Sequence, residues 1–347
     1  MIYKRRIAWG IARHIIFCLV AMILVCGAVM AQGATGKEAF PNREIRFIVP
    51  YSAGGASDRT ARQLAFLVDK LKLLDYPIVV TNIPGAGTME ALNEVVRSEP
   101  DGHTLLLHHN VFITQELLGT IDDRLTWHEG FEPVAQVLET PLTIAVLKES
   151  RWEKLADLFT EIEENPGEIK FGIPGVATPQ SFGLQALLYA YKQKTGIELK
   201  IHPVYYEGGA ATRTALLQGE IDVTPGISMD TVPDAKSGLC RILAVGTNIR
   251  IPSLPDVPTI EEEGFPMPLD AGGQSLRMAV WAPKGTSVEI ISTLSELLKH
   301  IVETDEWRDY ANSIAAIPIF RNSQELRRVF QSDAEALRPV VSLIKEQ

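Results

Sequence analysis

The chain has 347 residues and a formal net charge of −10; 46% of its residues are hydrophobic and 22% are charged. This composition excludes a disordered or fibrous protein, and the length is sufficient for two domains. An acidic balance without a basic block argues against a nucleic-acid partner. The three cysteines show no metal-ligand spacing, so we expect no metal site and no cofactor.

The first 31 residues differ from the rest. Lys4, Arg5, Arg6 and Arg13 precede an apolar run over residues 15–31, a pattern that predicts a secretory signal peptide cleaved after Ala31 and export to the periplasm. Two alternatives stay open, an uncleaved membrane anchor and a lipoprotein attached through Cys26. Cleavage would change the net charge from −10 to −14 and leave Cys240 as the only cysteine, which we expect to be a buried small hydrophobe.

After the leader, short β-branched runs alternate with helical patterns across glycine-rich loops. This alternation is typical of βαβ units and a parallel sheet. The expected strands are 45–49, 77–80, 104–107, 143–147, 170–173, 200–204, 221–223, 241–245 and 278–282. One expected helix begins near Asp58, and a second follows the turn 82–88 and runs through Leu92, Val95 and Val96. The others are 152–162, 180–194, 210–218, 288–302 and 323–344.

The repetition of the pattern predicts an α/β fold with two lobes, each a sheet flanked by helices. Residues 32–141 form the first part of lobe 1, and residues 142–250 form lobe 2. Residues 251–347 return to complete lobe 1. We expect the chain to cross between the lobes near 139–143 and near 245–253.

Three loops are rich in residues without bulk: 51–58, 82–88 and 172–178. In an open parallel sheet such loops lie at the carboxyl ends of strands, where helix N-termini attract anions. Taken singly, each loop is equally typical of a plain connection between a strand and a helix. Together they predict a site for a small carboxylate.

Several other polar residues stand at expected strand ends. Asn110, with His108 and His109 before it, follows a strand and either contacts a ligand or has a structural role. Asp222 either points into a cleft or is a solvated strand end. No dinucleotide fingerprint, P-loop, nucleophile elbow or zinc-protease motif is present, so we expect no catalytic site.

Residues 40–58, FPNREIRFIVPYSAGGASD, closely resemble the start of the receptors of tripartite tricarboxylate transporters, also called Bug proteins. Further matches follow in the same order over nearly the whole mature chain. They are residues 82–87, 100–107, 208–223, 254–264 and 282–286.

The resemblance implies a periplasmic-binding-protein-like fold of type II, a monomer with a ligand cleft between hinged lobes. It implies a small organic acid as ligand, delivered to a permease of one large and one small membrane subunit. The implied contacts come from the first glycine loop, the second glycine turn and the lobe 2 loop, partly through backbone groups and ordered water. With the two strand-end residues added, the candidate ligand-binding residues are Tyr51, Ser52, Ala53, Gly54, Gly55, Ser57, Asp58, Pro84, Gly85, Ala86, Gly87, Asn110, Gly175, Ala177, Thr178, Ser181 and Asp222.

The chain also departs from the pattern of these receptors. Ile83 and Glu207 stand where the family carries basic residues, and Thr88 replaces a glycine. Ala177, Thr178 and Ser181 replace a glycine, a serine and a histidine of the lobe 2 loop, and residues 224–230 also differ. Fewer positive groups near the cleft predict a monocarboxylate, or a ligand whose distal part is uncharged or cationic.

Three other functions remain open at this point. A receptor of the same fold could act as a ligand-sensing co-receptor for a membrane signalling system. An exported α/β hydrolase or isomerase would need a nucleophile and a base that the motifs do not supply. A purely structural envelope protein would have no use for the glycine loops.

Overall fold

The computed structural model describes residues 40–247, 250–251, 253–265 and 275–345. The chain divides into two units, Met1–Asn42 and Arg43–Gln347. The predicted signal peptide, its cleavage after Ala31 and the alternative at Cys26 lie outside the described residues. Everything that follows concerns the second unit.

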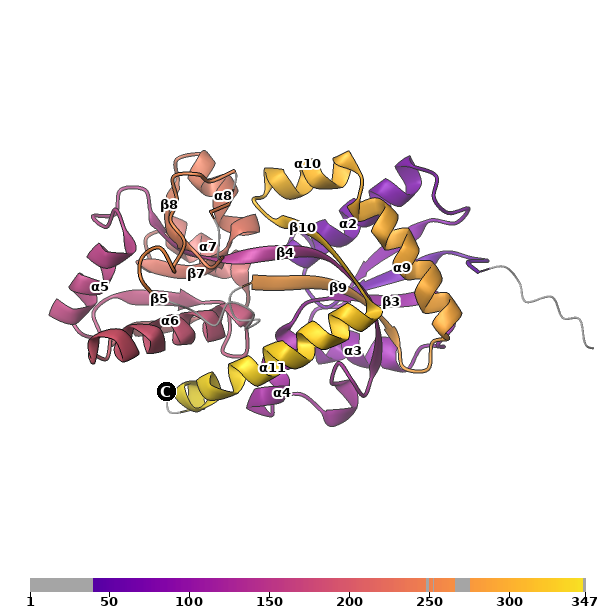
Figure 1. The fold of residues 1–347 in the computed structure, drawn as a ribbon, viewed down its shortest axis with the longest axis horizontal. Helices are drawn as coiled ribbons and strands as arrows, with labels where there is room; N and C mark the ends of the chain where they lie inside the picture. Colours follow the sequence, from indigo (N-terminus) through magenta and orange to yellow (C-terminus); the bar gives the residue numbers. More distant parts are fainter. Residues whose placement is uncertain (1–39, 248–249, 252, 266–274, 346–347) are drawn as a thin grey trace, which may run out of the picture. The chain divides into compact units, whose positions relative to one another are not determined.

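One half of the sheet, here called the first half, begins with three parallel strands in the order β2 (Ile78–Asn82), β1 (Ile45–Val49) and β3 (Thr104–His108). Beyond β3 the pairing becomes antiparallel, with β9 (Ser275–Pro283), residues 131–141 of β4 and β10 (Ile317–Asn322). The helices around this half are α2 (Ala56–Lys70), α3 (Met89–Val96), α4 (Val111–Leu118), α9 (Val288–Val302) and α10 (Asp305–Ser313) (Figure 1). β3 and β9 are buried along their whole length, as expected of strands covered on both faces.

The other half, here called the second half, is built on residues 142–147 of β4 (Phe131–Leu147). These residues pair antiparallel with β7 (Val223–Ile227) and β8 (Cys240–Val245). β5 (Lys170–Ile173) lies parallel to both β7 and β6 (His202–Tyr205). The helices of this half are α5 (Leu155–Glu164), α6 (Pro179–Thr195), α7 (Gly209–Leu217) and α8 (Ser228–Lys236).

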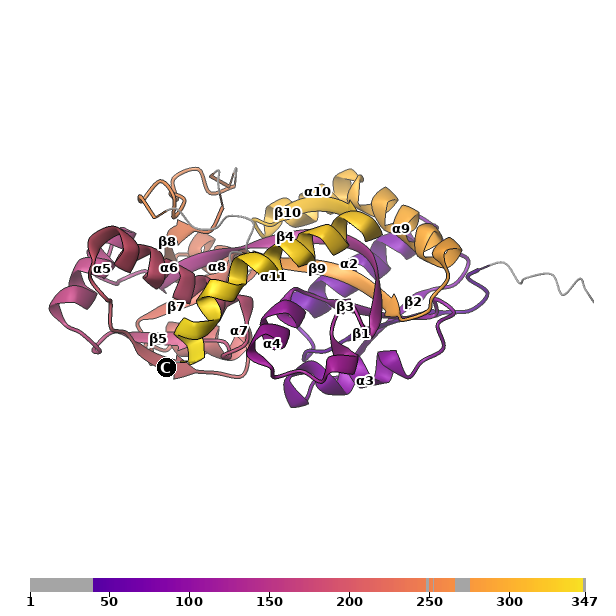
Figure 2. The ribbon, with the colours of Figure 1, turned by 60° about the horizontal axis from the view of Figure 1, so that its bottom comes forward.

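β4 belongs to both halves. Its partner changes between Pro141, which pairs with Ser275 of β9, and Leu142, which pairs with Ile227 of β7. The long helix α11 (Ser323–Lys345) also spans the change, because it packs on α4, on β4 and on α6 (Figures 1 and 2). One strand and one helix therefore connect the two halves beside the point where β4 changes partner.

A buried ionic network lies at this point. Arg277 of β9 donates to Asp333 of α11 at 2.7 Å and to Glu139 of β4 at 2.8 Å. Arg321 and Ser275 donate to the same Glu139 carboxylate. The arginine is 4% exposed and Asp333 is fully buried, so each buried charge has its partner and α11 is fixed to the sheet.

Most predicted elements are confirmed to within a few residues, but three features are wrong or were missed. The expectation of a parallel sheet holds for β2-β1-β3 and for β7-β5-β6, whereas every pair made by β4 or β9 is antiparallel. The strand expected at 221–223 begins at Val223 instead. α4, α8, α10, β10 and residues 131–142 of β4 were not predicted.

The prediction that Cys240 is buried is confirmed. Burial raises the pKa of its thiol to about 12. Within the part of the chain that the structure describes, no helix combines the length and hydrophobicity of a membrane span.

Candidate functional site

The loops at the carboxyl ends of the strands in both halves are joined to one another near the point where β4 changes partner. Asn82 at the end of β2 donates to the backbone carbonyl of Tyr51 at 2.9 Å. Gln115 of α4 donates to the carbonyl of Gly87 at 2.7 Å. Thr114 of α4 donates to the carbonyl of Ala177 in the second half. The three glycine loops singled out in the sequence therefore lie together.

The first glycine loop leads directly into the N-terminus of α2. Gly54 has φ +86°, a conformation that a residue with Cβ adopts at a cost. Gly55 is the N-cap and has no side chain, so it leaves the first-turn N–H groups without the cap that a serine or aspartate supplies. An N-terminus of this kind attracts an anion through both these donors and the helix dipole.

Two side chains of this loop are already bound within the protein. Ser57 is 2% exposed and its hydroxyl donates to the Met278 sulfur at 3.7 Å. Asp58 accepts hydrogen bonds from the Gly54 N–H at 2.8 Å and from Arg62. Burial raises the pKa of Asp58, but these hydrogen bonds outweigh burial and hold that pKa below its usual value. Both residues support the loop, and the exposed backbone of 52–54 is the part open to a ligand.

An aromatic group underlies the same loop. The Tyr51 ring stacks on His109, with centroids 5.1 Å apart, and His108 lies 5.7 Å from Tyr51. His108 is fully buried, and neither of its ring nitrogens has a hydrogen-bond partner among the described residues. Burial lowers the pKa of His108 far below its usual value and that of His109 to about 3, so both rings are neutral. Burial also raises the pKa of the Tyr51 hydroxyl.

Asn110 has a structural position. Its amide donates to the Ser275 carbonyl at 3.1 Å, and its side-chain oxygen accepts from the Arg277 N–H at 3.2 Å. It therefore fixes the end of β3 to β9, and its role as a ligand contact stays a prediction.

The loop of the second half is shaped by Thr178, the N-cap of α6. Its hydroxyl accepts from the Ser181 N–H at 3.3 Å and donates to the Gly175 carbonyl at 2.9 Å. Gly175 has φ +103°, and Ser181 is 2% exposed. Thr178 thus closes the loop on itself and orients the start of α6.

The remaining candidate residues lie in two different places, the turn 84–87 and the opposite edge of the sheet at Asp222. Pro84, Gly85, Ala86 and Gly87 are exposed on the turn that Gln115 ties to α4. Asp222 lies elsewhere: its carboxylate accepts from the Lys170 N–H at 2.8 Å at the amino ends of β5 and β7, the edge opposite to the glycine loops. The strand there starts two residues later than predicted, at Val223, so Asp222 precedes β7 and lies apart from the other candidates.

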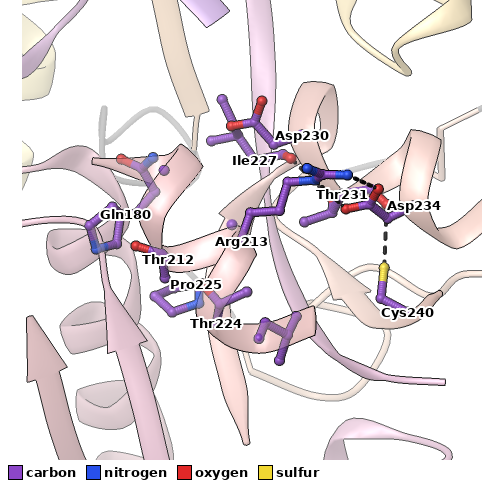
Figure 3. A pocket seen from close by; sticks show the side chains of 14 residues that line it. Gln180, Thr212, Arg213, Thr224, Pro225, Ile227, Asp230, Thr231, Asp234 and Cys240 are labelled. Atoms are coloured by element: carbon purple, nitrogen blue, oxygen red, sulfur yellow. Dashed lines mark hydrogen bonds and ion pairs between the residues drawn. The ribbon is translucent and has the colours of Figure 1, made fainter. Parts of the chain in front are cut away.

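The sequence reasoning missed a set of charged residues beside the second-half loop. Arg59 of α2 donates to Asp230 of α8 at 2.7 Å, and Arg213 of α7 is paired with Asp234. Asp230, Arg213 and Asp234 line a small pocket in the second half (Figure 3). The only signal in the sequence was that residues 224–230 depart from the familiar pattern, and it did not indicate a partner 171 positions away.

Metal binding has no support in this region. Among the described residues, no group of three or more histidine, cysteine, aspartate or glutamate side chains is placed to hold a metal ion. The two neighbouring histidines pack against aromatic rings instead.

A sequence profile described as "Tripartite tricarboxylate transporter family receptor" matches residues 60–345. The chain belongs to this family. A UPF0065 protein of Agrobacterium vitis is 29% identical, with 92% of this chain and 90% of that protein covered. Protein BugT of Bordetella pertussis is 27% identical, with 88% and 90% covered.

Solved structures share the receptor's fold. A Rhodopseudomonas palustris protein with adipate has a TM-score of 0.77 at 24% identity, covering 88% of this chain and 98% of that one. A second R. palustris protein, with bound malate, has a TM-score of 0.73 at 24% identity, covering 87% and 100%. The fold is therefore that of periplasmic binding proteins of this family, as the sequence predicted.

Proposed function

We propose that this receptor is exported to the periplasm, binds a small organic carboxylate between the two halves of its sheet, and delivers it to the large and small membrane subunits of a tripartite transporter. The observation that carries the proposal is the junction of glycine loops from both halves beside the α2 N-terminus, whose first-turn N–H groups have no side-chain cap. The fold neighbours recorded with adipate and malate support a carboxylate as the ligand class.

The proposed ligand contacts come from the backbone and side-chain groups of the candidate loops that are open to a ligand. The backbone of 52–55, the first-turn N–H groups of α2, the exposed turn 84–87 and the loop 175–178 bind the carboxylate. Tyr51, with its ring on His109, forms the wall beside them. A buried carboxylate must find a donor for each oxygen, and backbone N–H groups and water supply donors without an added charge.

The proposed motion is a hinge at the change of partner in β4, with lobe 2 starting at residue 142 and residues 251–347 completing lobe 1. Opening would break the contacts from Arg59 to Asp230 and from Thr114 to the Ala177 carbonyl. A ligand that touches both lobes favours the closed state by its differential affinity. The receptor acts as a monomer and needs no cofactor and no bond-making chemistry.

The carboxylate contact is tested by removing one backbone donor without changing the helix. Ala56 is the first residue of α2 and follows an extended residue, so proline fits there and removes only its N–H. Ala56→Pro should weaken carboxylate binding about tenfold or more, since a hydrogen bond to a charged group contributes roughly 1.5–3 kcal/mol. Binding is measured by calorimetry after a thermal-shift screen of carboxylates, amino acids and neutral compounds.

The matched control is Val288→Pro at the first position of α9, a helix of the same length far from the glycine loops in sequence. It should leave affinity unchanged. Equal affinity of Ala56→Pro and the unaltered receptor, or no carboxylate hit in the screen, would overturn the proposal. Delivery to a transporter is checked by uptake of the identified ligand in cells with and without the receptor.

A further inference from the structure

The pocket in the second half lies beside the proposed carboxylate site. It is lined by Pro174 and Gln180, which flank the loop 175–178, and by residues of α7, β7 and α8 (Figure 3). One of its residues, Asp230, contacts Arg59 in the first turns of α2, directly after the first glycine loop. A ligand carboxylate held at that loop therefore has this pocket within reach of its other end.

The polar groups of the pocket are mostly hydrogen-bond acceptors. The Thr212 hydroxyl already donates to the Gly208 carbonyl at 3.0 Å, which leaves its oxygen lone pairs. The Thr231 hydroxyl donates to the Ile227 carbonyl at 3.0 Å and also lies 3.0 Å from the Thr143 hydroxyl. Thr224 likewise donates to the Gly172 carbonyl. Asp230 uses one carboxylate oxygen for Arg59, and no bond is recorded for the other within the described residues.

Gln180 adds an amide to the lining of the pocket (Figure 3). The residue is 7% exposed, and its amide atoms are not among the buried polar atoms that lack a hydrogen-bond partner. An amide offers one acceptor oxygen and two N–H donors to a polar group that enters the pocket.

The charges of the pocket disfavour a second carboxylate. The second half supplies two carboxylates, Asp230 and Asp234, against one guanidinium, Arg213, which is already paired with Asp234. The balancing Arg59 comes from the first half and is bound to Asp230. Burial raises the pKa of Asp230 in spite of Arg59, as expected of a carboxylate short of donors.

The volume of the cavity also disfavours a second carboxylate. The cavity has a volume of about 20 Å³, room for one group of the size of a water molecule. A terminal hydroxyl or ammonium has one heavy atom of that size, whereas a carboxylate group has three heavy atoms.

We propose that this pocket binds the distal end of the ligand, and that this end is a hydrogen-bond donor, a hydroxyl or an ammonium, which the free oxygen of Asp230 accepts. The ligand class is then an ω-hydroxy or ω-amino carboxylate. The inference rests on the proposed function, because the ligand's carboxylate must first be held at the α2 N-terminus.

The test compares ligands that differ only at the distal end. Calorimetry of the purified receptor uses butyrate, γ-hydroxybutyrate, γ-aminobutyrate and succinate, and in parallel caproate, ε-hydroxycaproate, ε-aminocaproate and adipate. The hydroxy or amino member of one series should bind at least about tenfold more tightly than the dicarboxylate of the same length. Tightest binding of the dicarboxylate overturns this inference and leaves the carboxylate receptor standing, whereas binding of no compound overturns both.

The variant Asp230→Asn gives a second test, because it should change the affinities for the amino compound and for the dicarboxylate in opposite directions. It removes the charge that attracts the donor and releases Arg59, so affinity for the amino compound should fall about tenfold while affinity for the dicarboxylate rises. Asp222→Asn, an acid of the same half at the opposite sheet edge, is the matched control and should change neither. A misfolded variant would lose both ligands. Unchanged selectivity of a folded Asp230→Asn variant also overturns the inference.

Discussion

Arg59 on α2 and Asp230 on α8 form an ion pair at 2.7 Å although they are 171 positions apart and belong to different halves of the sheet. The same guanidinium approaches the Met229 carbonyl. Through these two contacts the Arg59 side chain of the first half binds one turn of the second half beside the glycine loops, and it thereby stabilises the closed arrangement.

Replacing Arg59 by glutamine should remove its ion pair with Asp230 and weaken the closed arrangement without unfolding the receptor. The pair is partly exposed, so it contributes about 0.2–1 kcal/mol, which predicts an affinity loss of up to about fivefold. Calorimetry gives the affinity, and small-angle scattering of the ligand-free protein should show a more open average. Arg43→Gln, which breaks a pair to Asp101 at the same distance, is the control. Equal affinities of the two variants would remove Arg59 from the mechanism.

His108 supplies the pH prediction. A buried imidazole with a lowered pKa contributes stability that is present above about pH 6.5 and is lost as the pH falls toward the folded-state pKa. Each neutral buried histidine should therefore cost the receptor about 1.4 kcal/mol per pH unit below that point. His108→Phe should remove its share of this acid sensitivity and leave stability at pH 7 unchanged or higher, because two unbonded nitrogens are replaced by an apolar ring.

Urea unfolding at several pH values measures this effect. The same substitution at exposed His300 is the control, because that ring is solvated in both states. A parallel pH dependence of His108→Phe and the unaltered protein would contradict the prediction. A fall in ligand affinity in His108→Phe would add that a ring nitrogen contacts the ligand.

The sequence predicted the outer parts of the fold because their signals are local. β1, β3 and β5 are short, largely apolar runs, β1 and β5 lead into proline- and glycine-containing loops, and each strand lies where expected. β4 was missed over residues 131–142 because Pro133 and Pro141 within it argue against a strand. α8 was missed for the same reason, since Pro233 lies inside the helix.

In the candidate site, too, the residues with a local sequence signal were predicted and those without one were not. Glycine loops could be found from sequence because glycine marks positive φ locally, as Gly54, Gly87 and Gly175 do. Asp222 was placed at the end of a strand expected at 221–223, but β7 begins at Val223 and runs to Ile227, so Asp222 precedes the strand and lies at its amino end. Arg59 and Asp230 could not be paired, because only the change of partner in β4 brings their helices together.

Arg277 should be the most sensitive polar position in the core. Arg277→Met leaves the carboxylates of Glu139 and Asp333 buried, and breaking a buried pair in this way costs about 3–5 kcal/mol. Arg327→Met, whose pair with Glu132 is partly exposed, should cost about 1 kcal/mol or less. Urea unfolding measures both.

A double variant separates two effects of Arg277→Met: the loss of the ion pairs and the cost of a buried carboxylate without a partner. Asp333→Leu added to Arg277→Met removes one uncompensated carboxylate, while Glu139 keeps its contact with Arg321. The double variant should therefore be more stable than Arg277→Met alone. Strict additivity of two destabilising changes would show that the network is not coupled as its geometry indicates.

The two N-caps Thr178 and Ser287 allow stability and binding to be separated. Both hydroxyls accept a hydrogen bond from the backbone N–H three residues later, at 3.3 Å in α6 and 3.4 Å in α9. Thr178→Ala and Ser287→Ala should each cost about 1 kcal/mol of stability. Only Thr178 also holds the Gly175 carbonyl, so only Thr178→Ala should weaken ligand binding, because the loop 175–178 loses its shape. Equal affinities of the two alanine variants, at equal losses in melting temperature, would exclude that loop from the ligand contacts.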